Sequence, residues 1–458
     1  MYSEQQQIYW HSGLYLQPQH FQSLDLHYAW LLARQRQLAQ PFNTGVAEAV
    51  INIDALEDDI LSIDRLRFIL PGGDYLEYPG NCRIEKRSFH DSWKRRDLPL
   101  TFWLVLRRFD PLHPNVTLPE KESDRAGTRW ISLGEAPVMK DIYDRSPDTA
   151  ITRLIYNVQL LTDAEKESAV DCESLPLIRL RHDGERVVCD PAFSPPVIEL
   201  RGSPALHKLI ETLYFELAAR AKKLSEFRRA GGADERLTRL LAMRSLNRTL
   251  PLLKNFLAAR QIHPWQIYNA LLQLMGELSS FDEDCSCLGE WRDGTKPAPG
   301  YDHYRLYESF SCLRQTLMAL IKGLALEDNL YLRLSNDGGI FYGRLERAAL
   351  AQKGGQLLLL LRSAQIKAGE KKFASTDIFK LASQERIEAL IQHALPGIPV
   401  TRCIDTPQGV PDRSDAAWYL IGRQSELWRQ AEESGTLAFY FPDMPDDLDV
   451  QLVATERE

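Results

Sequence analysis

The sequence changes its pattern at DPAFSPP, residues 190–196. Three of these seven residues are proline, which is unfavourable in helix interiors and central strands, so the stretch is expected to be a connection. Before it, apolar residues occur in short β-branched and aromatic runs. After it, they recur with the 3.6-residue period of an α-helix. We therefore predict that a β domain gives way to a helical domain here, with the boundary near residue 201.

The residues before this connection are predicted to form an N-terminal β-sandwich, residues 1–201, from several short strands with frequent turns. The main strand candidates are VINIDAL (50–56), ILSIDRLRFIL (60–70), LTFWLVLRRF (100–109) and LIYNVQLL (154–161). Asp183-Gly184 separates LIRLRH from ERVVCD and predicts a tight hairpin, because this pair tolerates positive φ at both central positions. The polar residues 110–148 contain few strand-like runs and are predicted to be long loops.

The residues after the connection are predicted to form a helical bundle, residues 202–326. A stripe of apolar residues begins at Leu206, continues to Leu224, and stops at Gly231-Gly232. Three further helices are predicted at about residues 234–259, with a kink at Pro251, at 264–278 after His263-Pro264, and at 302–324.

The last part, residues 327–458, mixes strand and helix patterns and is predicted to be a C-terminal α+β domain, so that the whole chain is a multidomain α+β protein. Its helix candidates are residues 383–394 and 424–433. Its strand candidates are LYLRL (330–334), GIFYGRL (339–345), QLLLLLRS (356–363), IPVTRC (398–403), AWYLIG (417–422), LAFYF (437–441) and VQLVA (450–454).

Composition limits the class of protein. The 458 residues are 44% apolar and 26% charged, as in folded proteins, and the net charge of −8 argues against a general nucleic-acid binder. The N-terminus lacks the pattern of a secretory signal, and no apolar run approaches the roughly 20 residues that span a bilayer. The seven scattered cysteines are expected to be reduced thiols. We predict a cytoplasmic protein without direct membrane insertion.

Enzyme motifs are absent from the sequence. It contains no Gly-rich phosphate loop, no dinucleotide fingerprint, no G-x-S-x-G elbow and no H-E-x-x-H helix. His11, His20 and His27 are the best metal-ligand candidates, but no cysteine or carboxylate joins them at a familiar spacing. Packing or hydrogen bonding is the preferred interpretation of these histidines. No catalytic residue, metal or cofactor is predicted.

The stretch YWHSGLYLQPQHFQ, residues 9–22, combines aromatic residues and glutamines without a charge. Trp and Tyr are the side chains most enriched in binding hot spots, and large apolar groups near a terminus need a partner to order them. The segment is predicted either to pack on its own sandwich or to dock on another protein. The interface candidates are Tyr9, Trp10, Leu14, Leu16, Pro18, His20 and Phe21.

Four motifs, in order along the chain, resemble the TssK family of type VI secretion baseplate subunits, also called ImpJ or VasE. The first runs from Trp10 through Gly13, Leu16 and Pro18 to Gln22, and the second is PPVIEL, residues 195–200. The third and fourth contain His263, Pro264, Tyr268, Leu271, Leu274, Gly276 and Leu278, and then Tyr301, Asp302, His303 and Phe310. The last third of the chain carries no such motif.

The resemblance implies a shoulder, a neck and a head at the three predicted domains, and a homotrimer similar to receptor-binding proteins of phage tails. It implies that the shoulder binds the wedge subunits TssF and TssG, and that the head binds the cytoplasmic parts of TssL and TssM. Such a protein docks the contractile tail at the inner membrane and needs no catalytic residue. The alternatives are an adaptor of another contractile injection machine, with a different head partner, and a metalloenzyme that uses the three N-terminal histidines.

Overall fold

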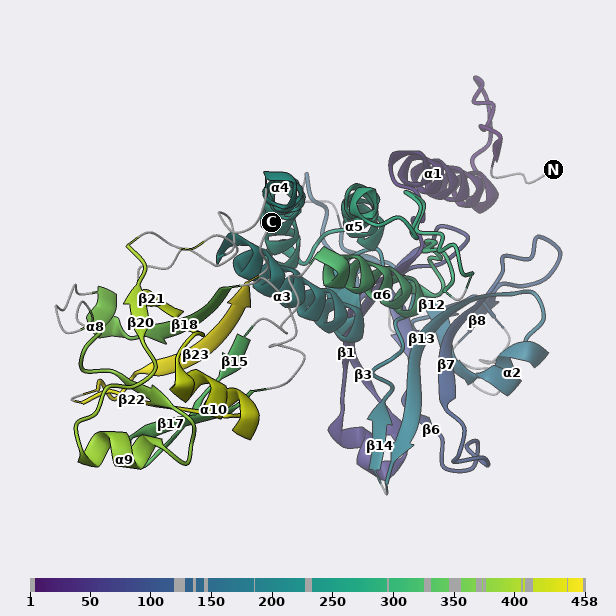
Figure 1. The fold of residues 1–458 in the computed structure, drawn as a ribbon. Coiled ribbons are helices and arrows are strands. Elements are labelled where there is room, and N and C mark those ends of the chain that lie inside the picture. The colour runs from purple at the N-terminus through teal and green to yellow at the C-terminus, as the bar shows by residue number, and fades with distance from the viewer. Residues whose placement is uncertain are drawn as a thin grey trace. The chain divides into compact units, whose positions relative to one another are not determined.

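The structure is a computed structural model in which most of the chain is described (Figure 1). The described residues are 5–118, 128–134, 137–143, 147–184, 186–226, 233–294, 296–324, 331–345, 356–367, 373, 376–404, 407, 415–442 and 444–455. The chain divides into two compact units, residues 1–216 with 248–319, and residues 217–247 with 320–458. The divisions fall inside helices, and the three predicted domains with boundaries at 201 and 326 stay a prediction.

The first unit contains two main β-sheets. A three-stranded antiparallel sheet has the order β1-β3-β4, with β1 at Gly45–Ile51, β3 at Ile63–Ile69 and β4 at Tyr75–Tyr78. A larger sheet is built around β7 (Leu100–Arg107), which pairs antiparallel with β12 (Leu154–Thr162) and β13 (Cys172–Asp183). Its outer strands are β14 (Arg186–Cys189), β9 (Trp130–Ser132), β8 (Val116–Thr117) and β5 (Cys82–Ile84). The strands predicted at 60–70, 100–109 and 154–161 are confirmed. The strand predicted at 50–56 was largely wrong: only its first two residues belong to β1, and Asp54–Asp58 form a 3-10 helix that begins where the Asn52 side chain accepts the Ala55 N–H.

Two details of this unit differ from the prediction. Asp183 pairs with Arg186, so the hairpin turn begins at Gly184, with φ +64°, one residue later than expected. The expectation of long loops over residues 110–148 was wrong in part, because β9 pairs with β12 and extends the larger sheet. Arg129 lies over the rings of Trp130 and Tyr156, and these packed side chains hold the short strand in place.

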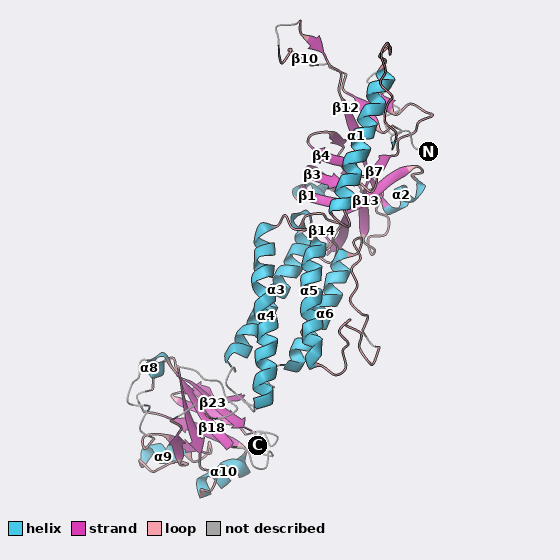
Figure 2. Cartoon of the chain, turned by 90° about the horizontal axis from the view of Figure 1, so that it is seen from above, coloured by secondary structure: helices cyan, strands magenta, loops and turns pink. Residues whose placement is uncertain are grey.

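The four predicted helices are confirmed. They are α3 (Pro204–Glu226), α4 (Ala233–Ala259), α5 (Pro264–Leu278) and α6 (Leu306–Leu324), and α4 contains Pro251. Their predicted apolar stripes are buried, and α5 and α6 lie side by side (Figure 2), with Tyr268 of α5 packed edge-on against Phe310 of α6. The predicted stop at Gly231-Gly232 lies outside the described residues. Helix α6 begins four residues later than expected, since residues 302–304 form a turn in which Asp302 accepts a hydrogen bond from the Tyr304 N–H.

One long helix, α1 at Pro18–Ala39, was not predicted from the sequence. Proline at its first position and a reciprocal capping box between Gln17 and His20 start the helix. Many of its apolar residues are exposed, so they do not form the single buried stripe from which a helix is normally predicted.

The C-terminal part of the second unit contains two antiparallel sheets around a buried aromatic core that includes Phe379, Tyr419, Trp428 and Phe439. One sheet has the order β15-β23-β18-β21-β20: Tyr331–Arg333, Asp449–Thr455, Gln356–Arg362, Ala416–Ile421 and Val400–Arg402. The other has the order β16-β17-β22-β19: Ser335–Asp337, Ile340–Arg344, Thr436–Tyr440 and Lys380–Ala382. The α+β prediction is confirmed here, including helices α9 (Ile387–Gln392) and α10 (Glu426–Ser434). In the described part of the chain, no helix combines the length and apolar character needed to cross a membrane.

Candidate functional site

The predicted interface segment leads directly into α1. The Gln17 N–H donates a hydrogen bond to Nδ1 of His20 at 3.1 Å, and the Trp10 ring lies 6.0 Å from the His20 ring. His20 therefore caps the first turn of α1, where backbone N–H groups have no partner inside the helix. This role occupies Nδ1 of the His20 ring and leaves only Nε2 for another ligand.

Most of the predicted interface side chains are exposed. The exposed fraction is 82% for Tyr9, 47% for Trp10, 54% for Leu16 and 51% for Phe21. Pro18 is also exposed, whereas Leu14 and His20 are half-buried. Exposed aromatic and leucine side chains in such number are typical of a surface that another molecule covers.

Helix α1 extends this surface with residues that the sequence analysis did not identify. Tyr28 and Leu32 follow Phe21 by seven and eleven positions, so the three side chains lie on one face of the helix. Leu31 lies beside them and is also exposed. We call this set the N-terminal apolar surface, and it comprises Tyr9, Trp10, Tyr15, Leu16, Phe21, Tyr28, Leu31 and Leu32.

Helix α1 is anchored to the first unit near its C-terminal end. Arg36 donates a hydrogen bond to the carbonyl oxygen of Gly73 at 2.5 Å, and Ala33 is buried against the same glycine. A Cβ at Gly73 would lie 2.5 Å from the Ala33 Cβ, and φ there is +98°, so the turn between β3 and β4 accepts the helix only with glycine. Earlier in the helix, His27 is buried and stacks on Trp30 with ring centroids 6.0 Å apart.

Residues 40–44 connect α1 to β1, and His263 holds this linker from the start of α5. Its Nε2 lies 3.2 Å from the Phe42 carbonyl oxygen, and its Nδ1 accepts the Trp265 N–H at 3.1 Å. A carbonyl oxygen only accepts, so the proton is on Nε2, and the neutral ring leaves Nδ1 to cap α5. Burial lowers the pKa of His263 to about 4, and the nearby His303 also lowers it.

His303 holds the same linker from the turn before α6. Its Nε2 donates to the Thr44 carbonyl oxygen at 2.6 Å, and its Nδ1 accepts the Tyr301 hydroxyl at 2.9 Å. Burial lowers the pKa of His303, against a smaller opposite effect of its hydrogen bond to Thr44. The two imidazoles stack with centroids 5.5 Å apart and planes inclined by 11°. We call His263 and His303, with the carbonyls of Phe42 and Thr44, the histidine clamp.

The other motif residues support the clamp. Tyr268 is buried and packs edge-on against Tyr301 at 5.2 Å, and Pro264 is the first residue of α5. The Asp302 N–H donates to the Ser309 hydroxyl, which holds the turn against α6. The structure thus brings all six predicted motif residues, His263, Pro264, Tyr268, Tyr301, Asp302 and His303, to one junction with the linker. Their partners Phe42 and Thr44 carry no motif and were not predicted.

A metal site made by the three N-terminal histidines does not fit this geometry. His20 and His27 lie seven residues apart on α1, which corresponds to roughly 10 Å along the helix axis. Zinc holds each histidine nitrogen at about 2 Å, so one ion cannot bind both rings. Across the residues that the structure describes, no three His, Cys, Asp or Glu side chains are placed to hold a metal ion together.

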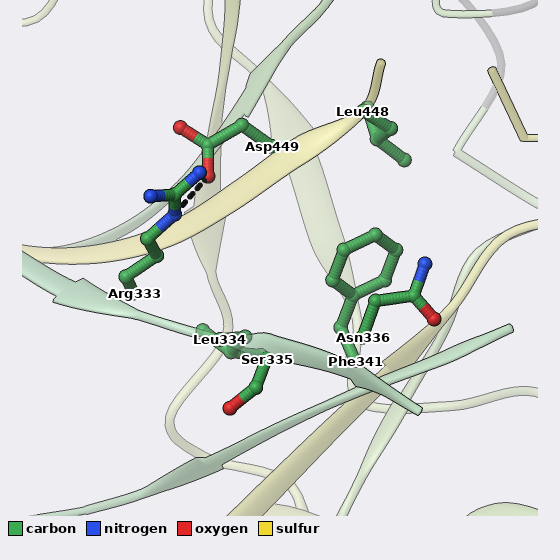
Figure 3. A pocket seen from close by; sticks show the side chains of 7 residues that line it. All are labelled: Arg333, Leu334, Ser335, Asn336, Phe341, Leu448 and Asp449. Atoms are coloured by element: carbon green, nitrogen blue, oxygen red, sulfur yellow. Dashed lines mark hydrogen bonds and ion pairs between the residues drawn. The ribbon is translucent and has the colours of Figure 1, made fainter. Parts of the chain in front are cut away.

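A pocket of about 390 Å³ lies in the second unit, and Figure 3 shows its lining. Its polar residues are Arg333, Ser335, Asn336 and Asp449, and Leu334, Phe341 and Leu448 supply its apolar part. The Arg333 Nε donates to Asp449 at 2.7 Å, so these two charges offset each other. The described residues of this lining combine a paired charge with apolar side chains, a composition suited to binding a ligand.

Comparisons with known proteins point to one family. The family model described as bacterial Type VI secretion, VC_A0110, EvfL, ImpJ, VasE matches residues 20–455. The chain is 23% identical over 441 residues to the type VI secretion system baseplate component TssK1 of Pseudomonas aeruginosa, with 94% of this chain and 95% of that protein covered.

Solved structures share the mixed α+β fold. A crystal structure of TssK is similar with a TM-score of 0.61 at 20% identity, covering 99% of this chain and 100% of that chain. A chain from the cryo-electron microscopy structure of a TssK–TssF–TssG baseplate subcomplex has a TM-score of 0.59 at 23% identity. That match covers 69% of this chain and 99% of the other chain.

Proposed function

The chain belongs to the family of bacterial type VI secretion proteins that includes ImpJ and VasE, and we propose that it is a non-enzymatic structural subunit of the secretion baseplate. The N-terminal apolar surface carries this proposal, because a chain that exposes Trp10, Leu16 and Phe21 together needs a partner to cover them. The baseplate component TssK1 is a relative over nearly the whole length of both chains.

We propose TssF and TssG as the partners that cover the N-terminal apolar surface. A structurally similar chain comes from a complex with these two proteins. Helix α1 presents Phe21, Tyr28 and Leu32 on one face, which is the arrangement by which an amphipathic helix lies in a groove of its partner. The aromatic residues of the preceding segment add side chains that commonly contribute most of the binding free energy.

The chain is further proposed to form a homotrimer through residues 202–326. Helices α3 and α4 carry exposed large apolar residues: Phe215, Leu237, Leu240, Leu241 and Leu252. Contacts between copies would bury these side chains and link trimer assembly to stability. Light scattering would then give about 157 kDa, three times the chain mass of 52.4 kDa.

Residues 327–458 are proposed to bind the cytoplasmic parts of TssL and TssM, which would place the protein in the cytoplasm and dock it at the inner membrane. A repeated subunit makes such contacts effective even when each is weak, because one bound copy raises the local concentration of the next. A chain that lacks residues 327–458 should still capture TssF and TssG but no longer TssL or TssM. Capture of TssL or TssM by the shortened chain would assign that contact elsewhere.

Affinity purification of the tagged protein from its own cells tests the main proposal, with Leu32→Asp as the variant. The wild type should recover TssF and TssG, and Leu32→Asp should recover at least tenfold less, since it places a charge in the proposed apolar contact. Leu112→Asp is the matched control, because Leu112 is 85% exposed in a loop outside the N-terminal apolar surface. Equal recovery by the wild type and Leu32→Asp would contradict the proposal.

A further inference from the structure

We propose that His263 and His303 are positioning residues for the docking helix α1: by holding the carbonyls of Phe42 and Thr44, they fix the direction in which α1 leaves the β-sheets. This inference rests on the proposed function of α1. It identifies two residues outside the N-terminal apolar surface that determine the direction in which α1 presents that surface.

Every ring nitrogen of the histidine clamp is hydrogen-bonded. Each histidine is at least 95% buried, and buried polar atoms are unfavourable unless they are paired. Here both nitrogens of each ring have a partner: two are carbonyls of the linker, one is the Trp265 N–H of α5, and one is the hydroxyl of Tyr301 before α6. An apolar side chain would fill the same volume, but only directional bonds specify the orientation of the two carbonyls.

The linker itself has an unusual backbone conformation at Phe42. Phe42 has φ +58°, a left-handed backbone conformation that non-glycine residues adopt rarely. Its ring stacks on His303 with centroids 5.5 Å apart and approaches Tyr301 at 5.0 Å. The clamp thus holds both the carbonyl and the side chain of the residue at which the backbone changes direction.

Backbone hydrogen bonds join the segments around the clamp to one another. The Val46 N–H donates to the Pro196 carbonyl oxygen at 2.8 Å, which ties β1 to the segment after the β domain. The Leu200 N–H donates to the Ile262 carbonyl oxygen at 2.9 Å, directly before His263. The linker is therefore held in a frame that reaches from β1 to the start of α5.

Because α1 is long, a small rotation at the linker displaces its far end by several ångströms. Its 22 residues span roughly 33 Å, and Phe21 lies near the far end. A rotation of about 10° at the linker would move that end by about 5 Å, which exceeds the tolerance of a packed interface. The contacts of Ala33 and Arg36 with Gly73 hold only the near end.

The test is the double variant His263→Asn with His303→Asn in the full-length protein. Asn at position 263 still caps α5, and Asn at either position is too short to reach the linker carbonyl. His303→Gln is the rescue variant, since its amide N–H reaches about as far as Nε2. His182→Asn is the matched control, because this half-buried histidine packs on Trp93 in the β domain, away from the linker.

Two measurements distinguish a failure of this proposal from a failure of the proposed binding function. Hydrogen exchange followed by mass spectrometry should show α1 and residues 40–44 exchanging at least tenfold faster in the double variant, with β7 and β13 unchanged. Affinity for purified TssF–TssG should fall at least tenfold and recover when His303→Gln replaces His303→Asn. If the wild type does not bind TssF–TssG, the proposed function fails, and the exchange of α1 still tests the clamp.

Unchanged exchange of α1 in the folded double variant would overturn the proposal. If the double variant does not fold, Tyr301→Phe replaces it, because this change removes only the hydroxyl that donates to His303 Nδ1. Faster exchange of α1 in Tyr301→Phe, with β7 unchanged, then supports the proposal, and unchanged exchange of α1 overturns it.

Discussion

The imidazoles of His263 and His303 stack 5.5 Å apart, and each donates a hydrogen bond to a different carbonyl of the same short linker. Neither ring can be protonated without a cost. A second proton would sit on Nδ1, which already accepts a hydrogen bond in both rings. The neighbouring side chains do little to stabilise a positive charge on the pair. Tyr301 and Tyr268 are neutral, and the carboxylate of Asp302 favours protonation of His303 alone.

We expect the stability of the protein to fall as the pH drops from 6.5 to 4. The pKa of His263 is about 4 in the folded state and about 6.5 when unfolded, so the unfolded state binds the extra proton between these values. The free energy of unfolding should therefore decrease by on the order of 2–3 kcal/mol from this residue alone, and the loss levels off below pH 4, where both states bind the proton. Urea unfolding at pH 7.5 and 4.5 measures the change.

The matched control for the pH dependence is His263→Asn. Acidic groups with lowered pKa values, such as Glu48 beside Arg67, also lose stabilisation in acid, but they do so equally in both proteins. The difference between wild type and variant isolates the histidine. Identical pH dependence in the two proteins would show that His263 does not contribute.

Trp10→Ala should weaken the binding of TssF and TssG about tenfold while leaving the melting temperature unchanged. Trp10 is 47% exposed in the chain alone, so little packing is lost when its ring is removed. Isothermal titration calorimetry gives the affinity and calorimetric melting gives the stability. A large drop in melting temperature would mean instead that the ring braces the fold.

Arg129→Met should destabilise the protein by about 3 kcal/mol, because it leaves the half-buried Asp74 without its cation. The guanidinium bonds Asp74 at 2.5 Å and the Arg107 carbonyl oxygen at 2.8 Å, and its side chain is only 7% exposed. Urea unfolding measures the loss. Arg95→Met is the control, since its pair with Asp97 is fully exposed to solvent, and its effect should be too small to detect.

Gly73→Ala should detach α1 without unfolding the sheets. The new methyl group would lie 2.5 Å from the Ala33 Cβ, on a backbone with φ +98°. Hydrogen exchange should accelerate in α1 and remain slow in β7. Gly184→Ala is the control for backbone strain alone, because it has φ +64° with nothing within 4 Å of the added carbon. Equal exchange of α1 in both variants would contradict this account of the contact.

The sequence predicted those elements whose apolar residues face the interior. The stripes of α3 and α5 and the runs of β18 and β21 are buried where the periodicity indicated. Helix α1 was missed because many of its apolar residues are exposed. They therefore do not form a stripe with the helical period that would indicate a buried face. Strand β9 was missed because it is only three residues long, and pairing with β12 decides its structure.

The candidate site was predicted only in part, for a similar reason. The aromatic character of residues 9–22 and the motif residues around His263 and His303 are visible in the sequence. Their relation is not, since the hydrogen bonds join Phe42 to His263 and Thr44 to His303 across 221 and 259 positions. No local pattern reports a contact over that distance.

That separation also has a consequence for synthesis on the ribosome. Thr44 leaves the ribosome 259 residues before His303, a delay on the order of 10–50 s at ordinary elongation rates. During this interval α1 has emerged but its clamp cannot close. If the clamp positions α1 as proposed, only a chain synthesised past His303 presents the helix in its final direction, so a translation product that ends before this residue should compete poorly for the proposed partner.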